Sequence, residues 1–514
     1  MVVIPDSDHT VRVNGCRSET FSFYDFAFLI ENERLGKKVM FDLGTRKDYW
    51  NLAPAVQRVF GIDSVMTVKQ LKIHWSEDSG EMGSSGTMGS SSTGPPIGAV
   101  SLSGYTFGSI DPFDSYPPTR LPREQIQRLI YSFHHKIAFQ YYPLDLEATS
   151  NPFLISWWPL ALGDPALFHV SLQTACLDEE RAAQKGFRSS EILMADSVTL
   201  LRRKIEDTSL AVQDGTMNSV ITLATIEFGK GNHEISQMHI EGVKRLVTLR
   251  GGINSVRQTS PLTARMITWV SMLIMGHPQF GTQDDFGIGD GIPPIPEWQI
   301  EPTFVYNDLD ENLDMEGGDE VMNVFVRLRS VFQRANRGPF PNTQLHDLTC
   351  FVVHRLLIST AGASISELSP TAECIRYAII LYLFIVQGPI YYPHEVMVNV
   401  MVAKLIENLE QRSHKSHEPA SLDFWLIAVG MVASTGTSQY EWLSKQATTI
   451  AGSLHIESAQ EVLDRIKSVL WLDKPQSEYM FSVQCEGFLT SQSRLNSPDL
   501  QTTVQPSDIM TEFL

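Results

Sequence analysis

A stretch of Gly, Ser, Thr and Pro separates a short front part of this chain from a much longer second part. Its centre reads GEMGSSGTMGSSSTGPP, residues 80–96, and it has too little apolar surface to offset the entropy lost on ordering. We therefore expect a flexible Gly/Ser-rich linker over residues 71–103, with separate folding units on its two sides. A length of 514 residues also exceeds what one core usually organises.

The part that follows the linker is a succession of helical patterns with short polar breaks. Helices are predicted over residues 123–141 and from Asp164, which Pro165 follows and which therefore offers a capped helix start. Further apolar helices are predicted near residues 345–361, 371–386, 395–410, 422–434, 440–451 and 459–470. The expected fold class is mainly all-α, with a multi-helix domain over residues 104–486 and a polar, disordered tail over 487–514.

Two local features of that domain are predicted in more detail. One is a helix that ends at a glycine stop after Arg250 and whose apolar stripe consists of Ile240, Val243, Leu246 and Val247. The other is an interruption over residues 279–318, rich in Gly, Pro and Asp. Such a composition predicts a long surface loop between helices.

The part that precedes the linker predicts a small α/β fragment over residues 1–70. Residues 26–43 read as two strands joined by a polar turn, and residues 47–60 read as a short helix. A fragment of about 60 residues is marginal as an independent core.

The charge balance limits the partners of this chain. Its 40 basic and 59 acidic residues give a formal net charge of −19, which disfavours direct binding to DNA or to an anionic membrane, because both require clustered Lys and Arg. The longest apolar run, Tyr377 to Val386, has about half of the ~20 residues that a bilayer-spanning helix needs. We expect it to be a buried helix.

The sequence assigns no catalytic, cofactor-binding or metal-ligating residue. The cysteines lack the close spacing of a structural zinc site and are expected to be reduced and buried; they are Cys16, Cys176, Cys350, Cys374 and Cys485. The histidines form no chelating set: His134 and His135 are adjacent, His414 and His417 lie in a polar break, and His169, His239 and His354 read as partly buried helix residues. Trp157 and Trp158 read as core packing.

Residues 101–485 resemble the C-terminal regulatory region of fungal transcription factors whose DNA-binding part is a binuclear zinc cluster held by six cysteines. The resemblance rests on GSIDPFDSYP at 108–117, on NPFLISWWPLALGDPALFHVSLQTACLD at 151–178, and on EFGKG, MHIEGV and LRGG within 221–252. It implies an all-α fold and a regulatory role in the nucleus. The implied partners are proteins, either a second copy of the chain or other transcription regulators.

Residues 11–70 resemble the opening strands of the metallo-β-lactamase fold through FAFLIENERLGKKVMFDLGTRKDYWNLAP at 26–54. In that family the carboxylate at the position of Asp42 supports a metal site whose ligands come from a later H-x-H-x-D-H cluster. Nothing in this sequence matches that cluster, and His74 lies in LKIHWSEDSG without a second histidine two residues on. The fragment therefore lacks the ligands that a hydrolytic metal centre needs.

The predicted function is that of a fungal transcription-factor-like regulatory protein, not an enzyme, which lacks a zinc cluster module and acts through protein or ligand interactions. It is expected in the nucleus, with the cytoplasm as the alternative. Two origins stay open: a regulator that acts without touching DNA directly, or a front part replaced by gene fusion or by an incorrect gene model. The position of the seam favours the second. The alternative functions are a metallo-β-lactamase-like hydrolase and an inert fused gene product.

Overall fold

The structure is a computed structural model. It describes five strands within residues 4–75 and the chain from residue 116 to 495, apart from residues 185, 303–317, 363–368, 389–394, 414–420, 455 and 457. The chain forms two compact units, residues 1–136 with 162–194 and residues 137–161 with 195–514.

Five strands belong to the first unit: β1 (Ile4–Pro5), β2 (Val11–Arg12), β3 (Phe26–Asn32), β4 (Lys37–Thr45) and β5 (Val68–Trp75). β1 pairs with β2, and β3, β4 and β5 form an antiparallel sheet in that order. The pair β3–β4 is the one that the sequence predicts, whereas β5 crosses the predicted fragment boundary at residue 70. The predicted helix over 47–60 and the centre of the linker lie outside the described residues.

The helical part of the first unit is built on α5 (Pro165–Ala183), against which α2 (Arg123–Ser132) packs. Asp164 caps α5 as predicted, since its Oδ1 accepts hydrogen bonds from the backbone N–H groups of Ala166 at 3.1 Å and Leu167 at 3.3 Å. An ion pair between Arg128 and Glu179, at 3.1 Å, joins the two helices at the surface.

Helix η2 (Phe133–Ile137) continues α2, and α4 (Trp158–Gly163) and α6 (Arg188–Ile205) also contain residues of both units. The second unit comprises α3 (Ala138–Tyr141), η3 (Phe153–Trp157), α7 (Thr208–Ala211), α8 (Asp214–Gly229), α9 (His233–Leu249), α10 (Ile253–Thr259), α11 (Pro261–Met275), η4 (Pro296–Trp298), α12 (Asp319–Ala335), α13 (Asn342–Gly362), α14 (Pro370–Gln387), α15 (Glu395–Ser413), α16 (Ser421–Ala433), α17 (Ser438–Ser453), α18 (Ala459–Val469) and α19 (Pro475–Leu495).

The predicted helices of the second unit are confirmed within a few residues at each end. Between residues 116 and 495 the described segments contain no strand, only an isolated bridge between Thr282 and Ile292. The mainly all-α prediction therefore holds for this part of the chain. Helix α19 continues to Leu495, beyond residue 487, where the polar tail is predicted to begin.

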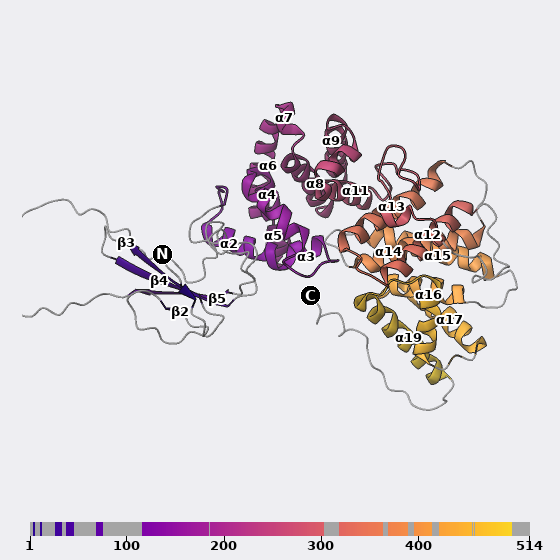
Figure 1. Ribbon diagram of the computed structural model, residues 1–514. Helices are drawn as coiled ribbons and strands as arrows, with labels where there is room; N and C mark the ends of the chain where they lie inside the picture. Colours follow the sequence, from indigo (N-terminus) through magenta and orange to yellow (C-terminus); the bar gives the residue numbers. More distant parts are fainter. Residues whose placement is uncertain are drawn as a thin grey trace, which may run out of the picture. The chain divides into compact units, whose positions relative to one another are not determined.

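Helix α14 lies in the core of the second unit and packs against α12, α13, α15 and α16 (Figure 1). By length and composition it is the one described helix that could cross a membrane, yet 83% of it is buried inside the structure. The fully buried Tyr382 accepts a hydrogen bond on its hydroxyl from the backbone N–H of Leu472 at 2.9 Å. These contacts identify α14 as the predicted buried helix.

Helix α9 presents the predicted apolar face to α8, and every residue of the stripe is buried: Ile240, Val243, Leu246 and Val247. The helix ends before Gly251 and Gly252, which both have a positive φ, +94° and +93°, that a side chain would strain. The guanidinium of Arg250 forms an ion pair with Asp214 and donates to the hydroxyl of Ser260 at 2.8 Å. Arg250 therefore holds the end of α9 to the start of α8 and to the residue before α11.

The predicted surface loop over 279–318 lacks long helices, but its described part is anchored rather than loosely solvated. The backbone N–H of Ile292 donates to the carbonyl of Gly281 at 2.8 Å, and the N–H of Gln283 donates to the carbonyl of Ile292 at 2.9 Å. Trp298 has none of its surface exposed. The described residues thus form the predicted loop between α11 and α12, and this loop also contributes an aromatic side chain to the core.

Replacing Gly291 with Ala is expected to lower the free energy of unfolding by about 2–3 kcal/mol. Gly291 has a φ of +115°, and a Cβ there would lie 2.3 Å from the carbonyl oxygen of Gly281. Gly289→Ala is the matched control, because Gly289 has a φ of +108° and open space around it. Urea unfolding followed by circular dichroism separates the two effects; equal losses in both variants would refute a role for the close approach to Gly281.

Candidate functional site

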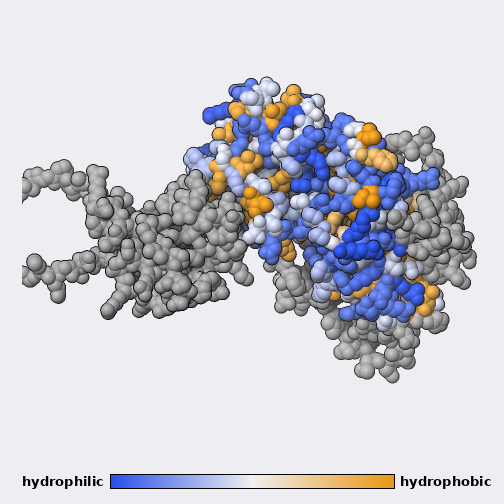
Figure 2. All heavy atoms as spheres, viewed as in Figure 1, coloured by the Kyte–Doolittle hydropathy of each residue, from blue (hydrophilic) through white to orange (hydrophobic). Residues whose placement is uncertain are grey.

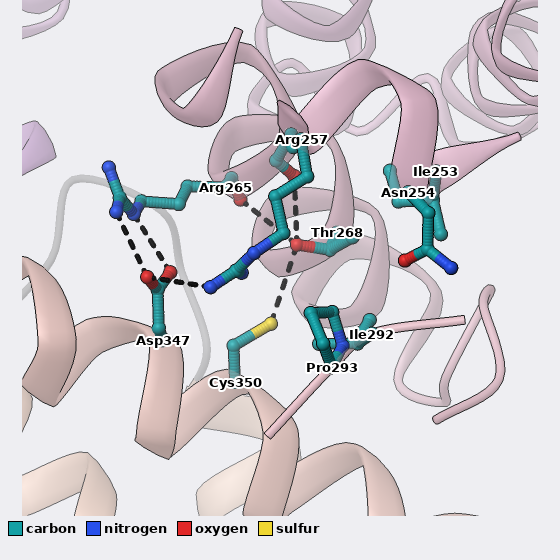
Figure 3. Close-up of a pocket in the computed structure, with 10 residues that line it drawn as sticks. Ile253, Asn254, Arg257, Arg265, Thr268, Ile292, Pro293, Asp347 and Cys350 are labelled. Carbon is teal, nitrogen blue, oxygen red and sulfur yellow. Dashed lines mark hydrogen bonds and ion pairs between the residues drawn. The ribbon is translucent and has the colours of Figure 1, made fainter. Parts of the chain in front are cut away.

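A part-buried cluster of two arginines and one aspartate connects α10, α11 and α13 (Figure 3). Arg265 binds the carboxylate of Asp347 in a bidentate manner, with Nε 2.8 Å from Oδ1 and Nη2 2.9 Å from Oδ2. Arg257 adds a single hydrogen bond from Nη2 to Oδ2 at 2.9 Å. The Asp347 side chain is only 6% exposed, so its charge is neutralised by these two guanidinium groups rather than by water.

The local sequence explains how the three side chains meet. Ser260 separates α10 from α11, and Pro261 takes the first helical position of α11, which starts a new helix directly after the break. Arg257 lies in the last turn of α10, and Arg265 lies near the start of α11. Both arginines can therefore reach a carboxylate on α13, which is about 80 to 90 residues further along the chain.

Two opposing effects determine the pKa of Asp347. Burial disfavours its ionised form, but the hydrogen bonds from Arg265 and the charges of Arg265 and Arg257 outweigh burial, so the pKa lies below its ordinary value. The ionised cluster carries two positive charges and one negative charge. The cluster therefore has one net positive charge, although the chain as a whole has a formal charge of −19.

Two histidines of α13 lie near this cluster in the interior. His346 packs between the rings of Trp269 and Tyr142, at centroid distances of 5.5 and 5.7 Å. Nδ1 of His354 donates to the carbonyl oxygen of Cys350 at 2.7 Å. Burial lowers the pKa of each histidine from 6.5 to about 4, and it raises the pKa of the Cys350 thiol to about 12.

Stability is expected to fall as the pH decreases from about 6.5 to about 4. Over this range the unfolded chain binds protons that the buried, neutral His346 and His354 do not bind, so protonation favours unfolding. Each histidine contributes up to about 1.4 kcal/mol per pH unit to this loss. Urea midpoints measured across the range test this expectation, because His354→Gln should reduce the slope of stability against pH. A flat profile would refute the burial of neutral histidines.

A small depression opens beside the cluster. Its lining residues are Ile253, Asn254, Arg257, Ala264, Arg265, Thr268, Ile292, Pro293, Asp347 and Cys350. The space measures about 260 Å³ with its opening to solvent included, and the cavity proper about 10 Å³, roughly enough for one water molecule. Figure 3 shows the guanidinium of Arg257 beside Asp347, with Asn254 and Pro293 on the other side of the depression.

The structure confirms the readings of the individual residues that it describes. Four cysteines are free and buried: Cys176, Cys350, Cys374 and Cys485. His134 is buried while His135 is exposed, as expected for neighbours on a helix. His169 is buried, His239 is partly exposed, and Trp157 and Trp158 belong to the core.

Other predicted features cannot be followed in the structure. Cys16, His414, His417 and the side chains of Asp42 and His74 lie outside the described residues. Among the described residues, no group of three or more His, Cys, Asp or Glu side chains is placed to hold a metal ion. The absence of metal, cofactor and catalytic residues stays a prediction for the chain as a whole.

The sequence analysis misses the cluster of Arg257, Arg265 and Asp347. The signal for two of its members is a charge within an otherwise apolar helical pattern, as in PLTARMITWV for Arg265 and LHDLTCFVVH for Asp347. Charged residues are rarely buried without a partner, so each position suggests an ion pair. Spacing along the chain does not identify the partner.

Comparison with known protein families gives one match, and it covers the helices that carry both arginines. Residues 127–276 match the family model of the fungal specific transcription factor domain. The matched segment is less than a third of the chain and includes α8 to α11, whereas Asp347 lies beyond it. No curated protein and no solved structure matches the chain.

This match confirms, over residues 127–276, the resemblance to fungal transcription factors that the sequence analysis describes. The matched family is a regulatory domain that is typically not enzymatic. No comparison supports the metallo-β-lactamase resemblance of residues 11–70.

Proposed function

We propose that this protein is a nuclear transcription regulator whose helical part acts through protein or small-molecule contacts and does not itself bind DNA. The observation that carries the proposal is the match of residues 127–276 to the fungal specific transcription factor domain. A domain of that family is regulatory, and a transcription factor domain suggests a nuclear protein. The proposed partners are a second copy of the chain or other transcription regulators.

The distribution of charge supports an indirect action on DNA. The formal net charge of −19 repels a polyanion, and DNA binding requires Lys and Arg side chains that can replace counterions at phosphates. Several arginines of the second unit are instead committed to internal carboxylates, among them Arg265 to Asp347 and Arg355 to Asp285. Figure 2 shows apolar residues scattered among hydrophilic ones on the visible surface rather than joined in one band.

Recruitment to a promoter tests the regulatory role. The full chain, fused to an unrelated DNA-binding module, is expected to change expression of a reporter gene several-fold relative to the module alone. A fusion carrying Asp347→Ala, which is expected to weaken the fold, is the matched negative control. Reporter expression that does not differ from that of the module alone would refute the proposal.

DNA binding by the purified full chain tests the second half of the proposal. At about 0.15 M salt we expect no affinity beyond the non-specific range of about 10⁻⁴ to 10⁻⁶ M. Nanomolar, sequence-specific binding to a promoter fragment would contradict it.

The cysteines support the further proposal that this chain holds no binuclear zinc cluster. The sequence has five cysteines without close spacing, whereas such a cluster requires six. Elemental analysis of the purified chain is expected to give less than one zinc per chain. Stoichiometric zinc would overturn this proposal, and zinc together with esterase or lactonase turnover would point to a hydrolase.

A further inference from the structure

We propose that the depression beside Arg257 binds a short-chain organic carboxylate. The inference rests on the proposed regulatory function and adds to it a class of small-molecule ligand and the residues that recognise it.

Arg257 has hydrogen-bonding capacity to spare. Its guanidinium gives Asp347 one hydrogen bond, from Nη2, whereas Arg265 uses two nitrogens for the same carboxylate. A guanidinium carries five N–H donors in a planar fork, which suits a carboxylate. The Arg257 side chain is also the more exposed of the two, at 26% against 17% for Arg265. A second carboxylate can therefore approach Arg257 without displacing Asp347.

The charge of the cluster favours an anion with a single charge. Asp347 neutralises one of the two arginines, so the ionised cluster retains one positive charge. A monocarboxylate would neutralise this remaining charge in a partly buried site, where charge pairs are stronger than in open water. A neutral molecule would gain no binding energy from this positive charge.

The walls of the depression select for a short hydrocarbon part. Ile253, Ala264, Ile292 and Pro293 supply apolar surface, and the Asn254 amide adds a polar group across from Arg257. The cavity proper, about 10 Å³, admits one water or one carboxylate oxygen. Only the carboxylate end of a ligand can therefore enter the cavity, and a short hydrocarbon part lies against the apolar walls in the open part of the depression.

Thermal unfolding of the full chain tests the proposal with sodium butyrate as the probe, and with inorganic phosphate and chloride at matched ionic strength as comparison arms. Butyrate is expected to raise the Tm in a saturable manner, because a ligand that binds only the folded state stabilises it by mass action. Arg257→Gln should weaken the fitted affinity by about tenfold or more, the effect of losing one charge-assisted hydrogen bond. Arg245→Gln, at an exposed position of α9, should leave the affinity unchanged.

Three results would overturn the proposal. They are no saturable response to butyrate, an undiminished response in Arg257→Gln, and a response to phosphate or chloride that equals the response to butyrate. Arg257→Lys keeps the charge and serves where Arg257→Gln does not fold; it should also bind more weakly, because it lacks the planar fork. If butyrate does not bind but the full-chain fusion still changes reporter expression, only the ligand site is rejected. If the fusion leaves reporter expression unchanged, the proposed function itself is rejected.

Discussion

Replacing Asp347 with Ala is expected to lower the free energy of unfolding by about 3–5 kcal/mol, because it leaves two arginines in the interior without their common partner. The side chains of Arg257 and Arg265 are 26% and 17% exposed, so water reaches them only in part. Asp347 receives three hydrogen bonds from them. The loss therefore combines the removed attraction with the cost of two charges that stay partly buried.

Urea unfolding monitored by circular dichroism measures this loss. Asp347→Asn keeps the shape and removes the charge, and we expect it to be nearly as destabilising as Asp347→Ala. Asp464→Ala, at an exposed position of α18, is the control and should change stability by less than about 0.5 kcal/mol. A loss of under about 1 kcal/mol in Asp347→Ala would show that the ion pairs are dispensable.

The same residue predicts a signature at low pH. Because the folded-state pKa of Asp347 is lowered, its ionised form stabilises the protein above the ordinary aspartate pKa of ~3.9. That contribution decreases as the pH falls below this value, through the folded-state pKa, when the carboxylate becomes protonated. Wild-type protein should therefore lose its advantage over Asp347→Ala in this acidic range. A difference that stays constant down to the lowest pH would contradict the assignment.

Replacing Trp298 with Ala is expected to cost about 3–5 kcal/mol, the range for removing a large buried aromatic side chain. Trp298 is fully buried, and its ring packs edge-on against Phe351 of α13 at a centroid distance of 5.4 Å. Its Nε1–H donates to Oδ1 of Asp285 at 2.8 Å. Deletion of the indole therefore leaves both a cavity and an acceptor with one partner fewer.

The loss of stability in Trp298→Ala should exceed that for an ordinary core residue, because the partner of Trp298, Asp285, connects the loop to two helices. Its carboxylate accepts a hydrogen bond from Asn323 of α12 at 2.9 Å and pairs with Arg355 of α13 at 2.5 Å. Arg327 of α12 donates to the carbonyl oxygen of Trp298 at 3.0 Å. Removing Trp298 thus weakens one network that fixes the loop between α11 and α12.

Denaturant midpoints of three variants separate the contributions. Trp298→Phe retains most of the ring and loses the hydrogen bond, so it should fall between wild type and Trp298→Ala. Ile300→Ala is the control within the same loop, because Ile300 is 52% exposed, and it should cost less than about 0.5 kcal/mol. Similar small losses in all three variants would show that the loop is not part of the core.

Helical periodicity predicted most of the second unit because its signal is local. Helix α9 illustrates this: four apolar residues at helical spacing and two following glycines predict both the buried face and the end of the helix. The helix start at Asp164 is equally local, since the cap is formed by residues within three positions of one another. Such features need no knowledge of distant parts of the chain.

The loop that contains Trp298 shows where local reasoning fails. Gly, Pro and Asp between residues 279 and 302 correctly predict the absence of long helices, but they do not show that Asp285 pairs with Arg355, which lies 70 residues away. The candidate site has the same property, because Asp347 is separated from Arg265 by 82 residues. The composition of the loop therefore predicts a position at the surface, but it does not reveal that Trp298 is buried in the core.

The sequence by itself determined the helical class of residues 116–495, the positions of most helices and the reduced, buried state of the described cysteines, because these follow from short-range periodicity, capping and side-chain polarity. Only the tertiary structure decided which charges are paired, where Trp298 lies and where a depression opens beside Arg257. The physical reason is that pairing and burial depend on side chains that meet only after distant helices pack, and no spacing along the chain encodes that meeting.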